Sequence, residues 1–216
     1  MFALAWHDGR NLEHLITYTD EPDKRNILRA AEVLRLGGVV IYPTDTYYGL
    51  AADIRSVVAV NRLLKIRNLP DATNLSLVCA DFSHLSSYTL PISNAYFRIM
   101  RKALPGPYTF ILPASGLAPR QLQNKRKNIG LRIPDHPVAG MLISALGSPL
   151  ASASLSEKMD GVDHHFRDPE EILAHYFDTV DVFLDHGWSE GKPSTLVDLT
   201  GDEPTVLRTG KGNVFW

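Results

Sequence analysis

Apolar residues recur along this chain with two alternating periods. Where they are spaced three and four positions apart, the pattern predicts helices over residues 24–36, 56–67, 93–104, 138–146 and 169–176. Shorter apolar runs separate these segments and predict strands. The predicted strands cover residues 39–42, 75–79, 108–112, 128–133, 149–153, 180–184, 195–199 and 205–207.

The ends of the predicted helices carry residues that start and stop helices. Ser56 and Ser93 stand where a hydroxyl can accept the first free backbone N–H groups. Gly37-Gly38 and Gly147 follow two of the helices, and glycine commonly ends a helix. Helices and strands mixed in this order predict an α/β fold, in which helices flank one large, twisted, mixed β-sheet.

The composition is ordinary for a globular protein and limits the choice of partners. Of 216 residues, 44% are hydrophobic and 21% are charged. No repeat, low-complexity tract or glycine-serine linker divides the chain, so we expect a single domain over residues 1–216. The formal net charge of −2 means that a nucleotide or RNA site must come from local clusters of Lys and Arg. The simplest alternative is a protein with no nucleic-acid role.

The single cysteine and the apolar runs bear on cellular location. Cys79 lies in a predicted strand, and we interpret it as a small buried residue rather than a catalytic thiol. The first residues lack the basic start and long apolar run of a signal peptide. No stretch approaches the roughly 18 apolar residues of a membrane span. We therefore expect a cytoplasmic protein with no membrane partner.

Hydroxyl groups cluster where two predicted strands end. Thr44 and Thr46 follow the strand at 39–42, and Ser152 and Ser154 lie where another strand runs into a polar loop. Open α/β sheets place ligands at strand ends, and residues two apart on an extended chain point the same way. The alternative in both places is a plain turn whose hydroxyls bond their own backbone.

Three cations stand out by position. Lys65 and Arg67 end a predicted helix, where the helix dipole favours cations in any case. The functional alternative is a pair that converges on a phosphate or carboxylate. Arg132 lies inside an apolar strand, where an unpaired guanidinium is costly to bury. It therefore needs an internal carboxylate or an anionic ligand.

In their order and spacing, these segments resemble the YrdC/YciO family over about residues 26–210. The resemblance includes Pro43-Thr44-Asp45-Thr46 with the following Tyr48-Gly49-Leu50, Lys65-x-Arg67, and Pro105-Gly106-Pro107-Tyr108-Thr109. It continues in Gly130-Leu131-Arg132-Ile133-Pro134-Asp135-His136-Pro137, Pro193-Ser194-Thr195-Leu196-Val197-Asp198 and Arg208-Thr209-Gly210. It implies a single YrdC-like domain with a basic cleft.

The resemblance also implies a reaction. YrdC-type members are L-threonylcarbamoyladenylate synthases, a kind of nucleotidyltransferase, and their product serves the threonylcarbamoyladenosine modification of tRNA. Threonine and bicarbonate give a carboxylated amine, whose carboxylate attacks the α-phosphate of ATP and releases pyrophosphate. ATP with Mg²⁺ would be a substrate, and no permanent cofactor or protein-bound metal site is expected.

Roles for individual residues follow from the same resemblance. Lys65, Arg67 and Arg208 would neutralise the phosphates, with Ser154 on the nucleotide side. Lys65 and Arg67 would also act in the chemical step.

The remaining roles concern the amino acid. Arg132 and Ser194 would hold the threonine carboxylate, with Thr46 nearby. Ser152 and Ser154 would bridge the two halves of the substrate, and Ser152 would take part in the step itself. We expect all of these residues to line one cleft.

Two departures from the usual family pattern place the resemblance in the YciO branch. Ser152-Ala153-Ser154 replaces Ser-x-Asn, and Leu75-Ser76-Leu77 replaces Asn-Pro-Leu. The runs at 68–71 and 123–127 also resemble this branch. Because a hydroxyl offers less hydrogen bonding than an amide, we expect slow adenylate synthesis. The alternative is a nucleotide- and RNA-binding protein, for double-stranded RNA or tRNA, without efficient turnover.

Two polar runs have weaker functional interpretations. Lys125-Arg126-Lys127 is either a solvated loop or part of a surface for RNA phosphates. His164-His165 lies among acidic residues, but no third metal ligand stands at a suitable spacing. We interpret that pair as part of a solvated loop.

Overall fold

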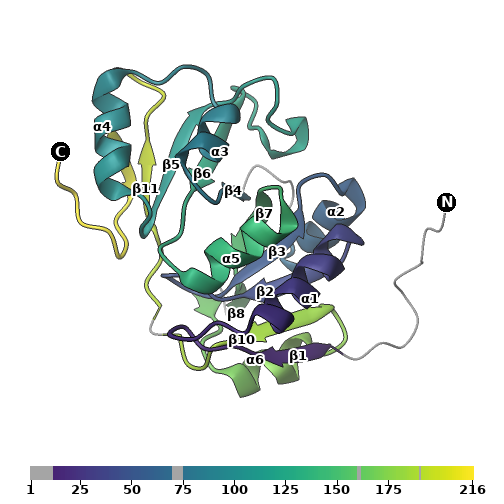
Figure 1. Ribbon diagram of the computed structural model, residues 1–216. Helices are drawn as coiled ribbons and strands as arrows, with labels where there is room; N and C mark the ends of the chain where they lie inside the picture. Colours follow the sequence, from purple (N-terminus) through teal and green to yellow (C-terminus); the bar gives the residue numbers. More distant parts are fainter. Residues whose placement is uncertain (1–11, 70–74, 160–161, 190) are drawn as a thin grey trace.

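A large mixed sheet with helices on both sides dominates the computed structural model, which describes residues 12–69, 75–159, 162–189 and 191–216 (Figure 1). The strands are β1 (Glu13–Ile16), β2 (Val39–Tyr42), β3 (Gly49–Asp53), β4 (Ser76–Val78), β5 (Tyr108–Pro113), β6 (Asn128–Arg132), β7 (Leu150–Ser154), β8 (Ser156–Met159), β9 (Val162–His165), β10 (Val182–Asp185), β11 (Thr195–Asp198) and β12 (Thr205–Arg208). Ten of them form one sheet in the order β1-β10-β2-β3-β7-β4-β6-β5-β11-β12. The predicted α/β fold is confirmed.

Five of the six helices in the described structure were predicted, and capping residues mark several of their ends. The helices are α1 (Lys24–Arg35), α2 (Val57–Ile66), α3 (Phe82–Ser87), α4 (Asn94–Ala103), α5 (Pro137–Leu146) and α6 (Pro169–Tyr176). Ser56 accepts from the backbone N–H of Ala59, and Ser93 accepts from that of Tyr96. Gly147 ends α5 in the left-handed conformation, with φ of 75°.

Both faces of the sheet are buried, and the two faces contact different helices. Val40 and Tyr42 of β2 pack in one cluster with apolar residues of α1 and α5. Val39 and Ile41, which point the other way, pack in a second cluster with residues of α2, α4 and α6. This two-sided burial explains why the β2 sequence is a continuous apolar run.

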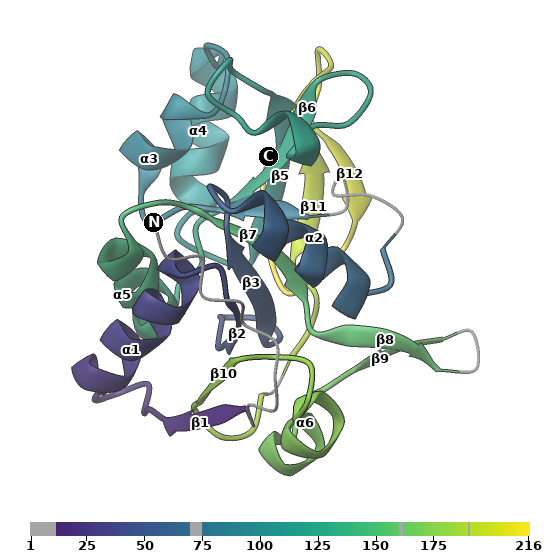
Figure 2. The same cartoon turned by 90° about the vertical axis from the view of Figure 1, so that its right-hand side faces the viewer.

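The structure contains elements that the apolar pattern did not predict, namely β1, β3, α3 and the hairpin of β8 and β9. The hairpin projects from the body of the molecule (Figure 2). The prediction of a solvated loop at His164-His165 is therefore wrong. His164 Nε2 lies 2.8 Å from Glu171 Oε1, and the ring of His165 stacks on that of Tyr47 at 3.9 Å. The pair belongs to strand β9 and has partners on α6 and on the chain between β2 and β3.

Some features named above lie outside the described residues. They are the first residues of the chain and residues 70–71. None of the helices in the described part of the chain has the length and hydropathy that crossing a bilayer requires.

Candidate functional site

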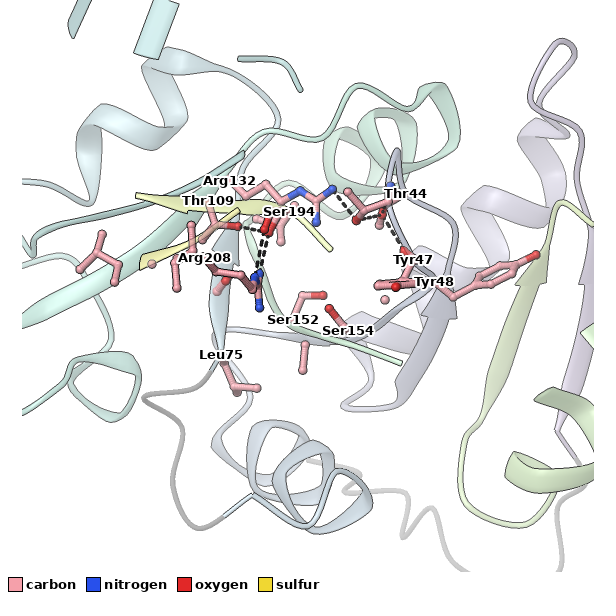
Figure 3. A pocket seen from close by; sticks show the side chains of 18 of the residues that line it. Thr44, Tyr47, Tyr48, Leu75, Thr109, Arg132, Ser152, Ser154, Ser194 and Arg208 are labelled. Atoms are coloured by element: carbon pink, nitrogen blue, oxygen red, sulfur yellow. Dashed lines mark hydrogen bonds between the residues drawn. The ribbon is translucent and has the colours of Figure 1, made fainter. Parts of the chain in front are cut away.

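A cavity of about 340 Å³ opens on one side of the sheet. Its walls come from the connection between β2 and β3 and from β4, β5, β6, β7, β11 and β12. Figure 3 shows Ser152 and Ser154 of β7 pointing toward the space that Arg132, Ser194 and Arg208 border. Most of the predicted site residues, from segments far apart in the chain, thus line one cavity.

Arg132 is held in place by an acidic partner. Its side chain is only 11% exposed, and its Nη2 donates to Asp45 Oδ1 at 2.5 Å and to Thr46 Oγ1 at 2.8 Å. The internal carboxylate that burial of this arginine requires is therefore Asp45. Arg132 Nε and Asp45 Oδ2 are buried, and neither has a hydrogen-bond partner in the described structure.

Arg208 is a second guanidinium in the cavity, and it has no acidic partner among the described residues. Its Nε donates to the carbonyl oxygen of Ser194 and its Nη2 to Ser194 Oγ, both at 3.1 Å. Burial lowers the pKa of Arg208, and repulsion by the nearby charge of Arg132 lowers it further. No described residue that lines the cavity is Asp or Glu. The arrangement therefore leaves a positive charge for an anion to neutralise.

Hydroxyl groups occupy much of the remaining surface of the cavity. Thr109 Oγ1 lies 2.9 Å from Ser194 Oγ, and Tyr42 Oη lies 2.9 Å from Ser152 Oγ. Ser76 of β4 is the register partner of Ser152 and also lines the cavity. Such a surface offers donors and acceptors at many points without adding charge.

The turn after β2 has both features that its sequence allowed: one threonine bonds the backbone of the turn, and both threonines line the cavity. Thr44 Oγ1 donates to the carbonyl oxygen of Tyr47 at 2.6 Å and accepts from the backbone N–H of Thr46. Thr44 therefore shapes the turn, as in the plain-turn alternative. Thr46 instead accepts from Arg132, and both threonines line the cavity.

Lys65 and Arg67 are not among the residues that line this cavity. Lys65 is exposed in the last turn of α2. Arg67 is the C-cap of the same helix, and its Nη2 donates to Ser156 Oγ at the start of β8. The structure thus brings together Thr46, Arg132, Ser152, Ser154, Ser194 and Arg208, but not the Lys65-x-Arg67 element.

Sequence reasoning missed residues in the cavity and beside it. Asp45 does not line the cavity but holds Arg132, and the sequence left open whether the partner of Arg132 is an internal carboxylate or a ligand. Asn128 lies four residues before Arg132 on the same strand, so alternation places it on the same face. Asn124 also lines the cavity and precedes β6 in a tight turn.

A buried histidine, His136, lies near Asp45 and faces the half-buried His186. The ring centroids of His136 and His186 are 5.3 Å apart. Burial lowers the pKa of His136 to about 4, with His186 adding to the effect and Asp45 opposing it. Neither ring nitrogen of His136 has a hydrogen-bond partner in the described structure. His136 is therefore a neutral, buried imidazole at neutral pH.

Comparison with known proteins places these observations in a family. The family model for Sua5, YciO and YrdC, described as telomere recombination, matches residues 32–210. The YciO protein of Escherichia coli is 43% identical over 198 residues, which cover 91% of this chain and 95% of the relative. A threonylcarbamoyl-AMP synthase of Halorhodospira halophila is 32% identical over 189 residues, which cover 88% of this chain and 92% of the relative.

Solved structures agree with the sequence comparison. The crystal structure of E. coli YciO has a TM-score of 0.87 at 41% identity and covers 94% of this chain and 97% of its own. The crystal structure of P. abyssi Sua5 complexed with L-threonine has a TM-score of 0.82 at 27% identity. It covers 92% of this chain, which spans 57% of that protein. The chain therefore belongs to the Sua5/YciO/YrdC family, which includes threonylcarbamoyl-AMP synthases.

Proposed function

We propose that this protein is an L-threonylcarbamoyladenylate synthase, which makes threonylcarbamoyl-AMP and pyrophosphate from threonine, bicarbonate and ATP for tRNA modification. The observation that carries the proposal is the position of Arg208. Arg208 is an exposed residue whose guanidinium lines the cavity; it has no acidic partner among the described residues, and the described lining of that cavity has no carboxylate. Such an environment favours a polyanion such as a triphosphate.

Arg132 suits the amino-acid end of the substrate. Asp45 and Thr46 bond its Nη2, and no described residue accepts a hydrogen bond from its Nη1. A guanidinium fixed in this way retains donors for a carboxylate. The P. abyssi homologue, whose crystal contains L-threonine, supports a threonine site in this fold.

The chemical step needs charge neutralisation and positioning more than acid–base catalysis. The threonine amine and bicarbonate first form a carbamate and water. A carbamate oxygen then forms a bond to the α-phosphorus, and the bond from that phosphorus to the bridging oxygen breaks, so that pyrophosphate leaves. Arg208 would offset the charge on the phosphates, while Ser152 and Ser194 donate hydrogen bonds to the joined substrates.

Magnesium would accompany ATP as part of the substrate. Since the described lining contributes no carboxylate, the ion would be held by phosphate oxygens and water, which is how Mg²⁺ commonly binds with nucleotides.

The test is product formation with purified protein. Incubation with ATP, Mg²⁺, threonine and bicarbonate should yield pyrophosphate and threonylcarbamoyl-AMP, and omission of either threonine or bicarbonate should abolish both. Arg208→Met should lose the activity, whereas Arg98→Met, an exposed arginine of α4, should retain it. If ATP binds but no pyrophosphate appears under any condition, the synthase proposal is wrong.

That negative result would favour a binding protein for nucleotide and RNA without turnover. One observation speaks for this second candidate, because Lys65 and Arg67 do not line the cavity and Arg67 bonds Ser156 instead. A filter-binding assay with tRNA and double-stranded RNA would then identify the partner.

A further inference from the structure

Strand β6 presents three residues of different character to the cavity. Asn128, Gly130 and Arg132 alternate with the buried residues Ile129 and Leu131, so they share one face of the sheet. All three line the cavity. At about 3.3 Å per residue, Asn128 lies about 13 Å from Arg132 along the strand. The cavity therefore has a cationic end and an amide end, separated by a position with no side chain.

The middle of this strand forms a flat floor. Gly130 pairs with Ile111 of β5 on one side and with Ser76 of β4 on the other. A Cβ at position 130 would lie 3.4 Å from Ser76 Oγ and 3.5 Å from Thr109 Cγ2, so packing leaves room for one. Packing alone therefore does not require glycine here. The open floor, beside the apolar side chain of Ile111, is suited to a flat ring.

Two carboxamides stand at the far end of this floor. Asn124 Oδ1 accepts from the backbone N–H groups of Arg126 and Asn128, at 2.9 and 3.0 Å, which fixes the orientation of its side chain. The carboxamide of Asn128 has no hydrogen-bond partner in the described structure, and its residue is half-buried. Asn128 therefore offers one donor group and one acceptor to a ligand.

We propose that Asn128 is the residue that selects adenine as the base of the nucleotide, an inference that rests on the proposed function. With the phosphates at the arginine end of the cavity, the base extends over Gly130 toward the amides. The Asn128 oxygen accepts from the adenine N6 amino group while its nitrogen donates to N7, the pairing that asparagine makes with adenine. Guanine presents an oxygen in place of that amino group, so the Asn128 oxygen would face another acceptor.

The test compares two nucleotides rather than activity. Calorimetry should give a lower dissociation constant for ATP than for GTP, by about 5- to 150-fold, since a bidentate pair contributes about 1–3 kcal/mol of discrimination. Asn128→Ala should remove this preference, because it should raise the dissociation constant for ATP and leave that for GTP unchanged. Asn128→Asp, which keeps the shape, should remove it as well. Asn94→Ala, at an exposed position of α4, should keep it.

Two results would overturn the inference. One is a parent protein that binds ATP and GTP with equal affinity. The other is an Asn128→Ala variant that binds ATP and GTP more weakly by the same factor. The residue would then contact the ribose or the phosphates, which the two nucleotides share. Either result would leave pyrophosphate release from ATP intact. Conversely, a parent that prefers ATP and loses this preference in Asn128→Ala, but releases no pyrophosphate, would contradict the synthase proposal and keep the role of Asn128.

Discussion

At the scale of single residues, charge compensation in the cavity is uneven. Arg132 has Asp45 as a partner, while Arg208 has only the hydroxyl and carbonyl oxygens of Ser194. Arg208 is an exposed residue, so its guanidinium can pair with an anion in the cavity without giving up an internal carboxylate. An anionic ligand therefore gains a charge-assisted hydrogen bond from Arg208, whereas Arg132 already shares its charge with Asp45.

Ser154 sets an expectation for rate. It lies at the exposed end of β7 and lines the cavity, and it stands where the Ser-x-Asn element that the sequence resembles has its asparagine. We expect Ser154→Asn to speed adenylate formation in single-turnover experiments by about 5- to 150-fold, because a hydrogen bond regained in the transition state contributes about 1–3 kcal/mol. ATP affinity should change little. Ser83→Asn, on the exposed side of α3, is the control. A Ser154→Asn variant no faster than the parent would contradict this expectation.

His136 makes stability depend on pH. Its pKa in the folded protein is about 4, below the ordinary 6.5, so between these values the unfolded chain binds a proton that the folded protein does not. Stability that is present above pH 6.5 is therefore lost as the pH falls toward 4, by about 2 kcal/mol at pH 5. Urea unfolding at pH 7 and pH 5 measures the loss. The loss should be smaller in His136→Asn and unchanged in His84→Asn, and parallel behaviour of the two variants would refute the assignment.

At the scale of elements, replacement of glycine by alanine should lower the free energy of unfolding at one position and raise it at another. A Cβ at Gly210 would lie 2.1 Å from the carbonyl oxygen of Pro193 and 2.5 Å from the carbonyl carbon of Ser194, which are backbone atoms. A Cβ at Gly140, inside α5, would have no neighbour within 4 Å. We expect Gly210→Ala to destabilise the protein by about 1–3 kcal/mol. We expect Gly140→Ala to stabilise it by about 0.5–1 kcal/mol.

Urea unfolding of the two variants measures these changes, and nucleotide affinity gives a second readout. Gly210→Ala should also weaken ATP binding, because the displaced backbone carries Ser194, which anchors Arg208. Gly140→Ala should bind ATP as the parent does. Equal stability of Gly210→Ala and the parent would show that the segments near residues 193 and 210 are free to separate.

The elements that the sequence predicted are those whose own residues determine them. Helices α1, α2, α4, α5 and α6 combine apolar periodicity with capping residues or a terminal glycine, so local signals suffice. Strand β3 has the sequence Gly49-Leu50-Ala51-Ala52-Asp53, which lacks β-branched residues. It is a strand because it pairs with β2 and β7 on both sides. Strands β8 and β9 are mostly polar and pair only with each other within the described structure.

In the candidate site too, some residues could be placed from the sequence and others depend on tertiary packing. The motifs at strand ends converge because the sheet order brings those ends together, and alternation along β6 would have revealed Asn128. Lys65 and Arg67 end a helix, and the side to which a helix end points depends on packing that sequence spacing does not give. Their absence from the cavity lining follows from the way α2 packs against the sheet and from the contact of Arg67 with the β8–β9 hairpin.

At the scale of the whole molecule, the cavity joins segments that are far apart in the sheet order. Thr44 and Thr46 follow β2, Ser152 belongs to β7, and Arg208 belongs to β12 at one edge of the sheet. The chain as a whole carries a net charge of −2, so any attraction for the ATP of the proposed reaction must come from the local arginines. A ligand that fills the cavity therefore contacts both halves of the sheet.

This arrangement predicts that ATP stabilises the molecule as a unit. A ligand that binds only the folded state adds about 2.7 kcal/mol to the free energy of unfolding at 100 times its dissociation constant. Urea midpoints with and without ATP should show this gain in the parent and in Arg98→Met. Arg208→Met should gain little at the same ATP concentration, because the charge that neutralises the phosphates is gone. Hydrogen exchange should slow in both β7 and β11, since both strands supply residues to the cavity. Slower exchange in one of these strands alone would mean that ATP binds to one wall without bridging the sheet.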